Sequence, residues 1–262
     1  MTRKDERKLN HFLLSSPSGV VLTTGWLEEQ GISSKLAWWY VQSGLLERLG
    51  MKAYKKPGDN ILWAGGVAAL QSQMHLPLHV GGKTALQVLG RAHFIPLQGV
   101  KQVQLFAGLN IRMPSWLGKQ LLKVEFEIHR TSLFSDSDKM LGIIERPVDG
   151  IAIKISCPER AAMEVLYLYP KFESLEEIML LIENLGQLRP AVVQSMLEKC
   201  NSIKVKRLFL FLAEKCQHPW LANLDFKKIN LGKGKRVIAS GGKYDSKYKI
   251  SLPELTEEKS EL

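Results

Sequence analysis

The stretch TTGWLEEQGISSKLAWWYVQSGLLERLGMKAYKK, residues Thr23 to Lys56, carries the signals of two short helices and two short strands in close succession. Thr23 or Thr24 can cap a first helix that runs to Gln30. Gly31 can end this helix because glycine adopts positive φ at little cost, and the residues after it form a tight turn. We therefore expect two helices joined at an angle.

The second helix of this stretch has two chemically different faces. Ser33 or Ser34 can cap it, and we expect it to end at Ser43, before Gly44. At about 100° per residue, an apolar face holds Ala37, Tyr40 and Val41. The opposite face holds Lys35, Trp38, Trp39 and Gln42. We interpret this second face as the one available to a partner.

After the second helix, residues 47–56 are predicted to form two short strands around a turn that contains Gly50, with a basic tip. Helix, turn, helix and hairpin in this order indicate a winged helix-turn-helix over residues 1–77. In DNA-binding domains of this kind the second helix enters the major groove, and basic residues neutralise phosphates. The predicted DNA-binding residues are Ser33, Ser34, Lys35, Trp38, Trp39, Gln42, Lys52, Tyr54, Lys55 and Lys56.

A different function for the same surface stays open, because two outward tryptophans could anchor a protein partner. In that alternative the chain is a protein-interaction adaptor that uses the face formed by Trp38 and Trp39.

The 262 residues are enough for two modest domains, and their net charge of +10 favours a polyanionic partner. Residues 199–249 contain 13 Lys or Arg and 3 Asp or Glu, so the excess positive charge lies in the C-terminal third. This segment could track phosphates as a second basic surface, or it could be a solvated face without a partner. The residues assigned to this surface are Lys199, Lys204, Lys206, Arg207, Lys233, Lys235 and Arg236.

Residues 78–252 are predicted to form a larger mixed α/β domain with a helical bundle portion, so the fold class is α+β. Alternating apolar residues predict strands over residues 101–108, 122–130 and 150–156. Helices are expected from Pro158, over 175–186 with Ser174 as cap, over 189–200 and over 205–216, the last one largely buried. A strand over 247–252 and a disordered acidic tail over 253–262 complete this part. Before it, we expect a first helix over residues 4–15, and a short strand followed by an Ala-rich helix over 61–73.

The cysteines and histidines do not suggest a metal centre. Cys157, Cys200 and Cys216 are widely spaced and lack a Cys-x-x-Cys pair, so neither a disulfide framework nor a zinc site is predicted. Pro77 separates His75 from His79, and we interpret the histidines as solvated loop residues. No cofactor is predicted. Without a signal peptide or an apolar run of membrane-spanning length, the chain is expected in the cytoplasm, with no membrane partner.

A metal-dependent nuclease is a further alternative. Its candidate residues lie on or beside predicted strands, where carboxylates and a lysine could hold a divalent ion and activate water. These residues are Glu125, Glu127, Asp149 and Lys154. Strand charges that face solvent explain the same pattern, so our main hypothesis has no enzymatic step.

Several segments together resemble the AbiEi-type antitoxins, which are transcriptional regulators of type IV toxin-antitoxin systems linked to abortive phage infection. The segments are GISSKLAWWYVQSGLLERL (31–49), KTALQVLG (83–90), CPERAAMEVLYLYP (157–170), VKRLFLFLAE (205–214) and LGKGKRVIASGGKYDSKYKISLP (231–253). The chain departs from related sequences at Trp38 and Trp39, where basic or small polar residues are usual.

The resemblance implies an N-terminal winged helix that binds inverted repeats of double-stranded DNA in the protein's own promoter, and a C-terminal domain that carries antitoxicity. It also implies a cognate toxin that resembles a nucleotidyltransferase and is countered without stable binding. On this basis we expect a monomer in solution that binds DNA cooperatively.

Overall fold

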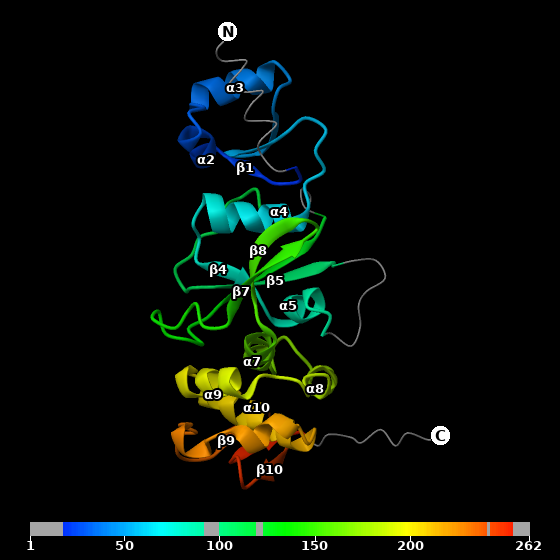
Figure 1. Ribbon diagram of the computed structural model, residues 1–262, viewed down its shortest axis with the longest axis vertical. Helices are drawn as coiled ribbons and strands as arrows, with labels where there is room; N and C mark the ends of the chain where they lie inside the picture. Colours follow the sequence, from blue (N-terminus) through cyan, green and yellow to red (C-terminus); the bar gives the residue numbers. More distant parts are fainter. Residues whose placement is uncertain (1–17, 92–99, 119–122, 240–241, 254–262) are drawn as a thin grey trace, which may run out of the picture. The chain divides into compact units, whose positions relative to one another are not determined.

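The structure is a computed structural model, and it describes residues 18–91, 100–118, 123–239 and 242–253. These residues form a mixed α/β protein whose elements are labelled in Figure 1. The predicted helix over residues 4–15 and nearly all of the predicted tail, residues 254–262, lie outside the described residues.

The chain divides into two compact units. Unit 1 contains residues 1–79, 100–130 and 145–154, and unit 2 contains residues 80–99, 131–144 and 155–262. The chain therefore passes between the units more than once. Unit 1 takes in residues well beyond position 77, the end that we expected for the N-terminal domain.

Unit 1 contains the two helices and the two strands predicted for residues 23–56, preceded by a short strand, β1, that was not predicted. In chain order they are β1 (Leu22–Thr23), α2 (Thr24–Glu29), α3 (Ser34–Gln42), β2 (Glu47–Gly50) and β3 (Ala53–Lys55). Strands β2 and β3 form an antiparallel hairpin, and β3 also pairs with β1, so the sheet order is β1-β3-β2. Helix, turn, helix and hairpin thus follow in the expected order.

Local hydrogen bonds set the ends of the two helices. The Trp26 backbone N–H donates to Thr23 Oγ1 at 3.3 Å, and the Leu36 N–H donates to Ser33 Oγ at 3.3 Å, so Thr23 and Ser33 are the caps. Gly31, at φ +79°, turns the chain between the helices. A small apolar cluster holds the helices against the hairpin, and it contains Leu22, Leu27, Ile32, Ala37, Tyr40 and Leu46.

After the hairpin, helix α4 (Trp63–Ala68) continues directly as a π-helix, η1 (Ala69–Gln73). The short strand expected at residue 61 is not formed. In η1, the Gln73 amide accepts from the Thr23 N–H at 2.8 Å and donates to the Val21 carbonyl at 2.7 Å. One side chain therefore holds the backbone on both sides of Leu22, next to the cap of α2.

A five-stranded sheet has the order β6-β5-β4-β8-β7. Its strands are β4 (Leu78–Val80), β5 (Gln102–Ala107), β6 (Glu125–Arg130), β7 (Ile143–Val148) and β8 (Ile151–Ser156). Strand β4 is parallel to β8, and β5 is parallel to β6. Strands β5, β6 and β8 lie where the alternating pattern predicted them.

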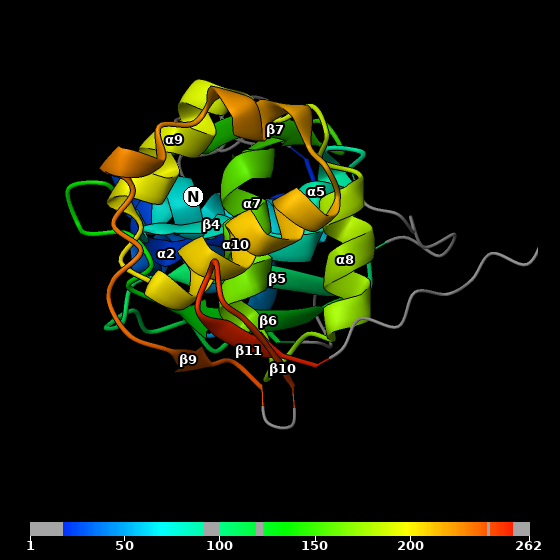
Figure 2. The same ribbon diagram turned by 90° about the horizontal axis from the view of Figure 1, so that it is seen from below.

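Unit 2 is mainly helical. Its helices are α5 (Gly82–Val88), α7 (Pro158–Leu168), α8 (Leu175–Glu183), α9 (Pro190–Lys199) and α10 (Ile203–Lys215), followed by two 3-10 turns, η2 (Pro219–Asn223) and η3 (Phe226–Lys228). Helix α7 contacts α8, α9 and α10, and Figure 2 shows these four helices grouped together. The predicted bundle is therefore present, and α10 is largely buried, as expected.

A small sheet of order β10-β11-β9 packs its buried residues into the same core. Its strands are β9 (Arg236–Val237), β10 (Lys243–Asp245) and β11 (Ile250–Leu252). The last predicted strand is thus shorter than expected, because it begins at Ile250 rather than at residue 247.

Candidate nucleic-acid interface

The two faces of α3 are separated as the sequence predicted. Ala37 and Tyr40 are fully buried in the apolar cluster of unit 1, and Val41 packs against it. The opposite face is exposed, and it carries Lys35, Trp38, Trp39 and Gln42. A charged, an amide and two indole side chains therefore project from one side of this helix.

The two tryptophans of this face differ in their surroundings. Trp39 is 38% exposed and packs edge to face against Tyr40, with ring centroids 6.1 Å apart. Trp38 is 59% exposed. Since Tyr40 belongs to the core, Trp39 is partly anchored, whereas Trp38 extends into solvent.

The serines at the start of α3 are engaged with neighbouring groups. Ser33 is the cap, and Ser34 Oγ donates to Glu28 Oε1 at 2.6 Å. Tyr54, on β3, is half-buried and packs against the apolar cluster. These three side chains therefore help to hold α3 and the hairpin in place.

Lys55, assigned to DNA contact from the sequence, is already paired within the hairpin. Its Nζ lies 2.8 Å from Glu47 Oε2 and donates to the Asp59 carbonyl at 2.8 Å. The hydrogen bond from Lys55, together with one from the Gly58 N–H, holds the pKa of Glu47 below its usual value. The charge of Lys55 is thus largely compensated.

The exposed cations of the hairpin are Lys52, at its turn, and Arg48, on β2. Lys52 adopts φ +59° and projects from the tip of the hairpin. Arg48 was missed in the sequence prediction. Strand alternation could have found it, because Arg48 is next to the apolar Leu49 and so points to the opposite face of the hairpin. Lys56 is half-buried at the end of the hairpin.

The predicted second basic surface does not form as one continuous patch. Lys206 is 3% exposed and Arg207 is 1% exposed, so both belong to the interior of unit 2. Burial lowers the pKa of Lys206, whose Nζ donates to the Asn230 carbonyl at 3.1 Å. The prediction that these two residues contribute charge to a surface is therefore wrong.

Arg207 binds backbone oxygens rather than solvent. Its Nε donates to the Leu231 carbonyl at 2.7 Å, and its two terminal nitrogens donate to three more carbonyls, those of Gly232, Gly234 and Lys249. A guanidinium has five N–H donors, and a buried one must satisfy them. Arg207 thereby fastens the segment after η3 to α10.

The other predicted members of this surface divide into two groups. Lys204 donates to the carbonyls of Tyr167 and Tyr169 at 2.9 and 2.6 Å, and Lys199 pairs with Asp138 at 2.5 Å. Three cations remain exposed on the Gly-rich segment that leads into β9, and they are Lys233, Lys235 and Arg236. Only this last group is available to a phosphate.

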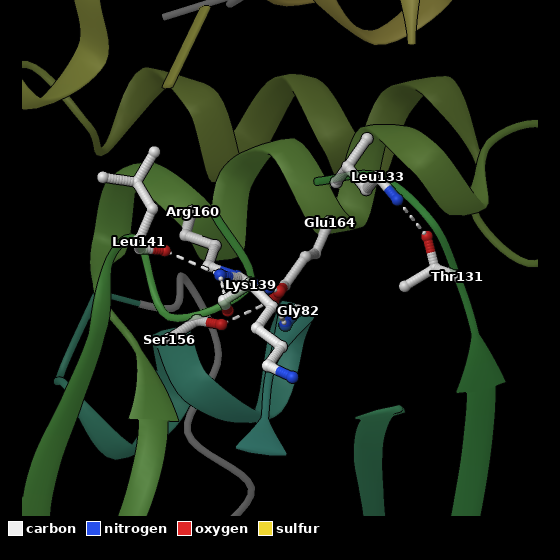
Figure 3. Close-up of polar contacts among 8 residues, drawn as sticks. All are labelled: Gly82, Thr131, Leu133, Lys139, Leu141, Ser156, Arg160 and Glu164. Atoms are coloured by element: carbon white, nitrogen blue, oxygen red, sulfur yellow. Dashed lines mark hydrogen bonds and ion pairs between the residues drawn. The ribbon is translucent and has the colours of Figure 1, made fainter. Parts of the chain in front are cut away.

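A buried polar network lies at the start of α7. Arg160 Nε donates to Glu164 Oε1 at 2.9 Å, and Glu164 Oε2 accepts from Ser156 Oγ at 2.8 Å and from the Gly82 N–H at 3.0 Å. Figure 3 shows these groups converging, with Arg160 also directed at the carbonyls of Lys139 and Leu141. This ion pair is buried, and it ties three segments of unit 2 together.

The histidines are less exposed than the sequence suggested. His79, on β4, and His129, on β6, both lie against Phe106, with ring centroids 5.9 and 5.2 Å apart, and both are buried. His218 is buried, and its Nε2 lies 2.7 Å from the Ile182 carbonyl. The interpretation as solvated loop residues is therefore wrong for these three, whereas His75 is exposed.

The carboxylates of the nuclease alternative are not brought together. Glu125 and Glu127 lie on β6, at one edge of the five-stranded sheet, while Asp149 lies in the turn between β7 and β8 at the other edge. Within the described part of the chain, no three His, Cys, Asp or Glu residues are placed to hold a metal ion. The three cysteines are free. None of the helices in the described ranges is long and apolar enough to cross a bilayer.

The fold defines a mixed α/β protein in which a helix-turn-helix with a hairpin precedes a larger helical unit. Two family models match nearly the whole chain. One, described as transcriptional regulator, AbiEi antitoxin N-terminal domain, matches residues 5–97, and the other, transcriptional regulator, AbiEi antitoxin, type IV TA system, matches residues 100–253. The chain therefore belongs to the AbiEi family of antitoxins and transcriptional regulators, as its sequence segments indicated.

A solved structure supports the fold over the same length. The RV2827C protein from Mycobacterium tuberculosis matches with a TM-score of 0.61 and 13% sequence identity, over 95% of this chain and 91% of that chain. At this identity the likeness shows the fold alone. A comparison with curated proteins found no match.

Proposed function

We propose that this antitoxin represses its own promoter by binding inverted repeats in duplex DNA through α3 and the β2–β3 hairpin. In this proposal α3 enters the major groove, and the hairpin lies on the flanking phosphates. The observation that carries the proposal is the exposed face of α3, which holds Lys35, Trp38, Trp39 and Gln42 opposite a fully buried face.

The distribution of exposed charge supports the same placement. Lys35, Arg48 and Lys52 are all exposed, and they lie on α3 and the hairpin of one compact cluster of elements. Each such cation can release counterions when it neutralises a phosphate. Lys55, which is paired with Glu47, contributes less to this attraction.

We assign antitoxicity to the C-terminal domain, residues 78–252, and the cognate toxin is proposed to resemble a nucleotidyltransferase that is countered without stable binding. This assignment rests on family membership, because the larger of the two matched models covers residues 100–253. The protein is proposed to act in the cytoplasm, without an enzymatic step, as a monomer that becomes cooperative on DNA.

The exposed cations Lys233, Lys235 and Arg236 of unit 2 are proposed to form a separate contact with phosphates. They follow a segment anchored by Arg207, so their backbone is held while their side chains stay free. This contact would add affinity without sequence preference.

An electrophoretic shift or anisotropy assay with the native upstream region, at two salt concentrations, tests the proposal. Lys35→Ala and Gln42→Ala should weaken binding, and Phe172→Ala, which removes an exposed aromatic of unit 2, is the matched control. Point variants are preferable to deletion of residues 1–77, because that deletion would split unit 1. If the wild type does not shift the upstream region at either salt concentration, the proposal is wrong.

The protein-interaction alternative predicts a different result in the same assay. If Trp38 and Trp39 anchor a protein, their replacement should leave DNA binding and its salt dependence unchanged. A loss of DNA affinity in those variants favours the DNA-binding proposal.

A further inference from the structure

Trp38 is a large apolar side chain held in solvent. It is 59% exposed, and among the described residues it makes no hydrogen bond, ion pair or ring contact, whereas Trp39 packs against Tyr40. A lone exposed apolar residue can be incidental. Trp38, however, stands in the middle of the face that the proposed function assigns to the major groove, between Lys35 and Gln42.

An indole cannot read bases as polar side chains do. It has one N–H donor and no acceptor, so it cannot form the two-point contacts that arginine or glutamine make with purines. The apolar group that base edges present in the major groove is the C5-methyl of thymine. A tryptophan on the outward face of α3 therefore fits a thymine better than any other base.

Gln42 independently favours the same kind of base pair. A glutamine amide can accept from adenine N6 and donate to adenine N7 at the same time. Gln42 follows Trp38 by four residues, which is about 6 Å along the helix axis, or about two base-pair steps. Trp38 and Gln42 thus both suit A·T pairs.

We infer that α3 reads A·T pairs, with Trp38 packed against the C5-methyl of a thymine and Gln42 bound to an adenine about two base pairs away. This inference rests on the proposed DNA binding. It assigns Trp38 to base recognition rather than to a protein partner, and it leaves Lys35 for the phosphates.

The inference can be tested before the operator is mapped. The upstream region is amplified either with thymidine or with deoxyuridine throughout, because uracil keeps the base pair and the O4 acceptor and lacks only the methyl group. Wild-type protein should bind the uracil duplex at least about fourfold more weakly, which corresponds to about 0.8 kcal/mol for one lost apolar carbon contact. Single uracil substitutions then locate the thymine.

The decisive measurement combines this change with variants of the protein. Trp38→Ala should bind both duplexes with equal affinity, and Trp38→Phe, which keeps an apolar ring, should retain part of the preference for thymine. Phe172→Ala, 55% exposed in unit 2, should keep the full wild-type preference. Circular dichroism and thermal unfolding should show that the exposed Trp38 can be replaced without loss of the fold.

The outcomes separate the two proposals. If wild type binds both duplexes equally, or if Trp38→Ala keeps the wild-type preference, the assignment of Trp38 is overturned and DNA binding by α3 stands. If wild type binds neither duplex, the proposed function is wrong and this inference falls with it.

Discussion

Lys55 Nζ lies 2.8 Å from Glu47 Oε2, so the hairpin next to α3 contains its own ion pair. This pair holds β2 to β3 from the side, and a further hydrogen bond from Lys55 reaches the carbonyl of Asp59. The hairpin therefore offers a DNA phosphate the charges of Lys52 and Arg48 rather than that of Lys55.

The hairpin variants should accordingly differ in their salt dependence. Lys52→Ala and Arg48→Ala should each flatten the plot of log affinity against log salt by about 0.9 for one lost phosphate contact. Lys55→Ala should change the slope less, while Glu47→Gln, which frees Lys55, should steepen it. Anisotropy titrations at four salt concentrations measure these slopes. Equal changes of slope for Lys52→Ala and Lys55→Ala would contradict the expectation that Lys52 binds a phosphate and the paired Lys55 does not.

The ion pair of Glu159 and Arg189 should make unit 2 sensitive to acid. Arg189 donates to Glu159 at 2.9 and 3.0 Å through its side chain and at 3.1 Å through its backbone N–H. Although burial raises the pKa of Glu159, these bonds and one from Cys157 lower it to about 2. A depressed folded-state pKa contributes stability that is present above pH 4.5 and is lost as pH falls toward 2.

Replacement of Glu159 tests this dependence. Glu159→Gln should lower the free energy of unfolding at neutral pH by about 2 kcal/mol, as expected for a lost hydrogen bond to a charged group. Its unfolding free energy should also fall less steeply between pH 4.5 and 2 than that of the wild type. Urea unfolding at several pH values measures both, and parallel pH profiles would show that Glu159 titrates normally.

The buried pair of Arg160 and Glu164 should respond strongly to the loss of one partner. Glu164→Gln or Arg160→Met should lower the free energy of unfolding by about 3 kcal/mol, because a buried charge is left uncompensated. The double variant Arg160→Met with Glu164→Gln should lose less than the two single changes together. Lys199→Ala, at an exposed pair, is the control and should cost less than about 1 kcal/mol. Additive single effects would indicate that the pair is not coupled.

Replacement of Arg207 and replacement of the exposed cations that follow it should have different effects on stability and on DNA binding. Arg207→Ala should destabilise unit 2, since four carbonyls lose a shared donor group. Replacing Lys233, Lys235 and Arg236 together by alanine should leave stability within about 0.5 kcal/mol and reduce the salt-dependent part of DNA affinity. Thermal unfolding and anisotropy on the same samples separate the two effects, and a triple variant with wild-type DNA affinity would remove these cations from the interface.

Local patterns predicted α2, α3 and the hairpin well because the signals there act over a few residues. Thr23 and Ser33 cap the helices through their own oxygens, and Ala37 and Tyr40 lie on the apolar face of α3. Such features need no knowledge of distant segments. The DNA contacts assigned to this face remain a prediction.

Long-range contacts account for the errors. Lys206 and Arg207 look like surface charges in the sequence, but they lie on a helix that is covered on nearly all sides. Their side chains therefore donate hydrogen bonds to backbone carbonyls more than twenty residues further along the chain. His79 and His129 are buried because neighbouring strands bring Phe106 against both of them. Lys55 was assigned to DNA because its partner across the hairpin, Glu47, could not be paired with it from the pattern alone.

The anchoring by Arg207 also bears on the order in which the protein is made. The carbonyls that accept hydrogen bonds from Arg207 belong to residues 231–249, which leave the ribosome after α10 is complete. Without these residues, the buried guanidinium would lack acceptors. A nascent chain that stops before residue 231 therefore holds an unsatisfied arginine at its centre. Unit 2 should therefore become resistant to proteases only once residues 231–249 are synthesised, and chains that terminate before them should be degraded faster.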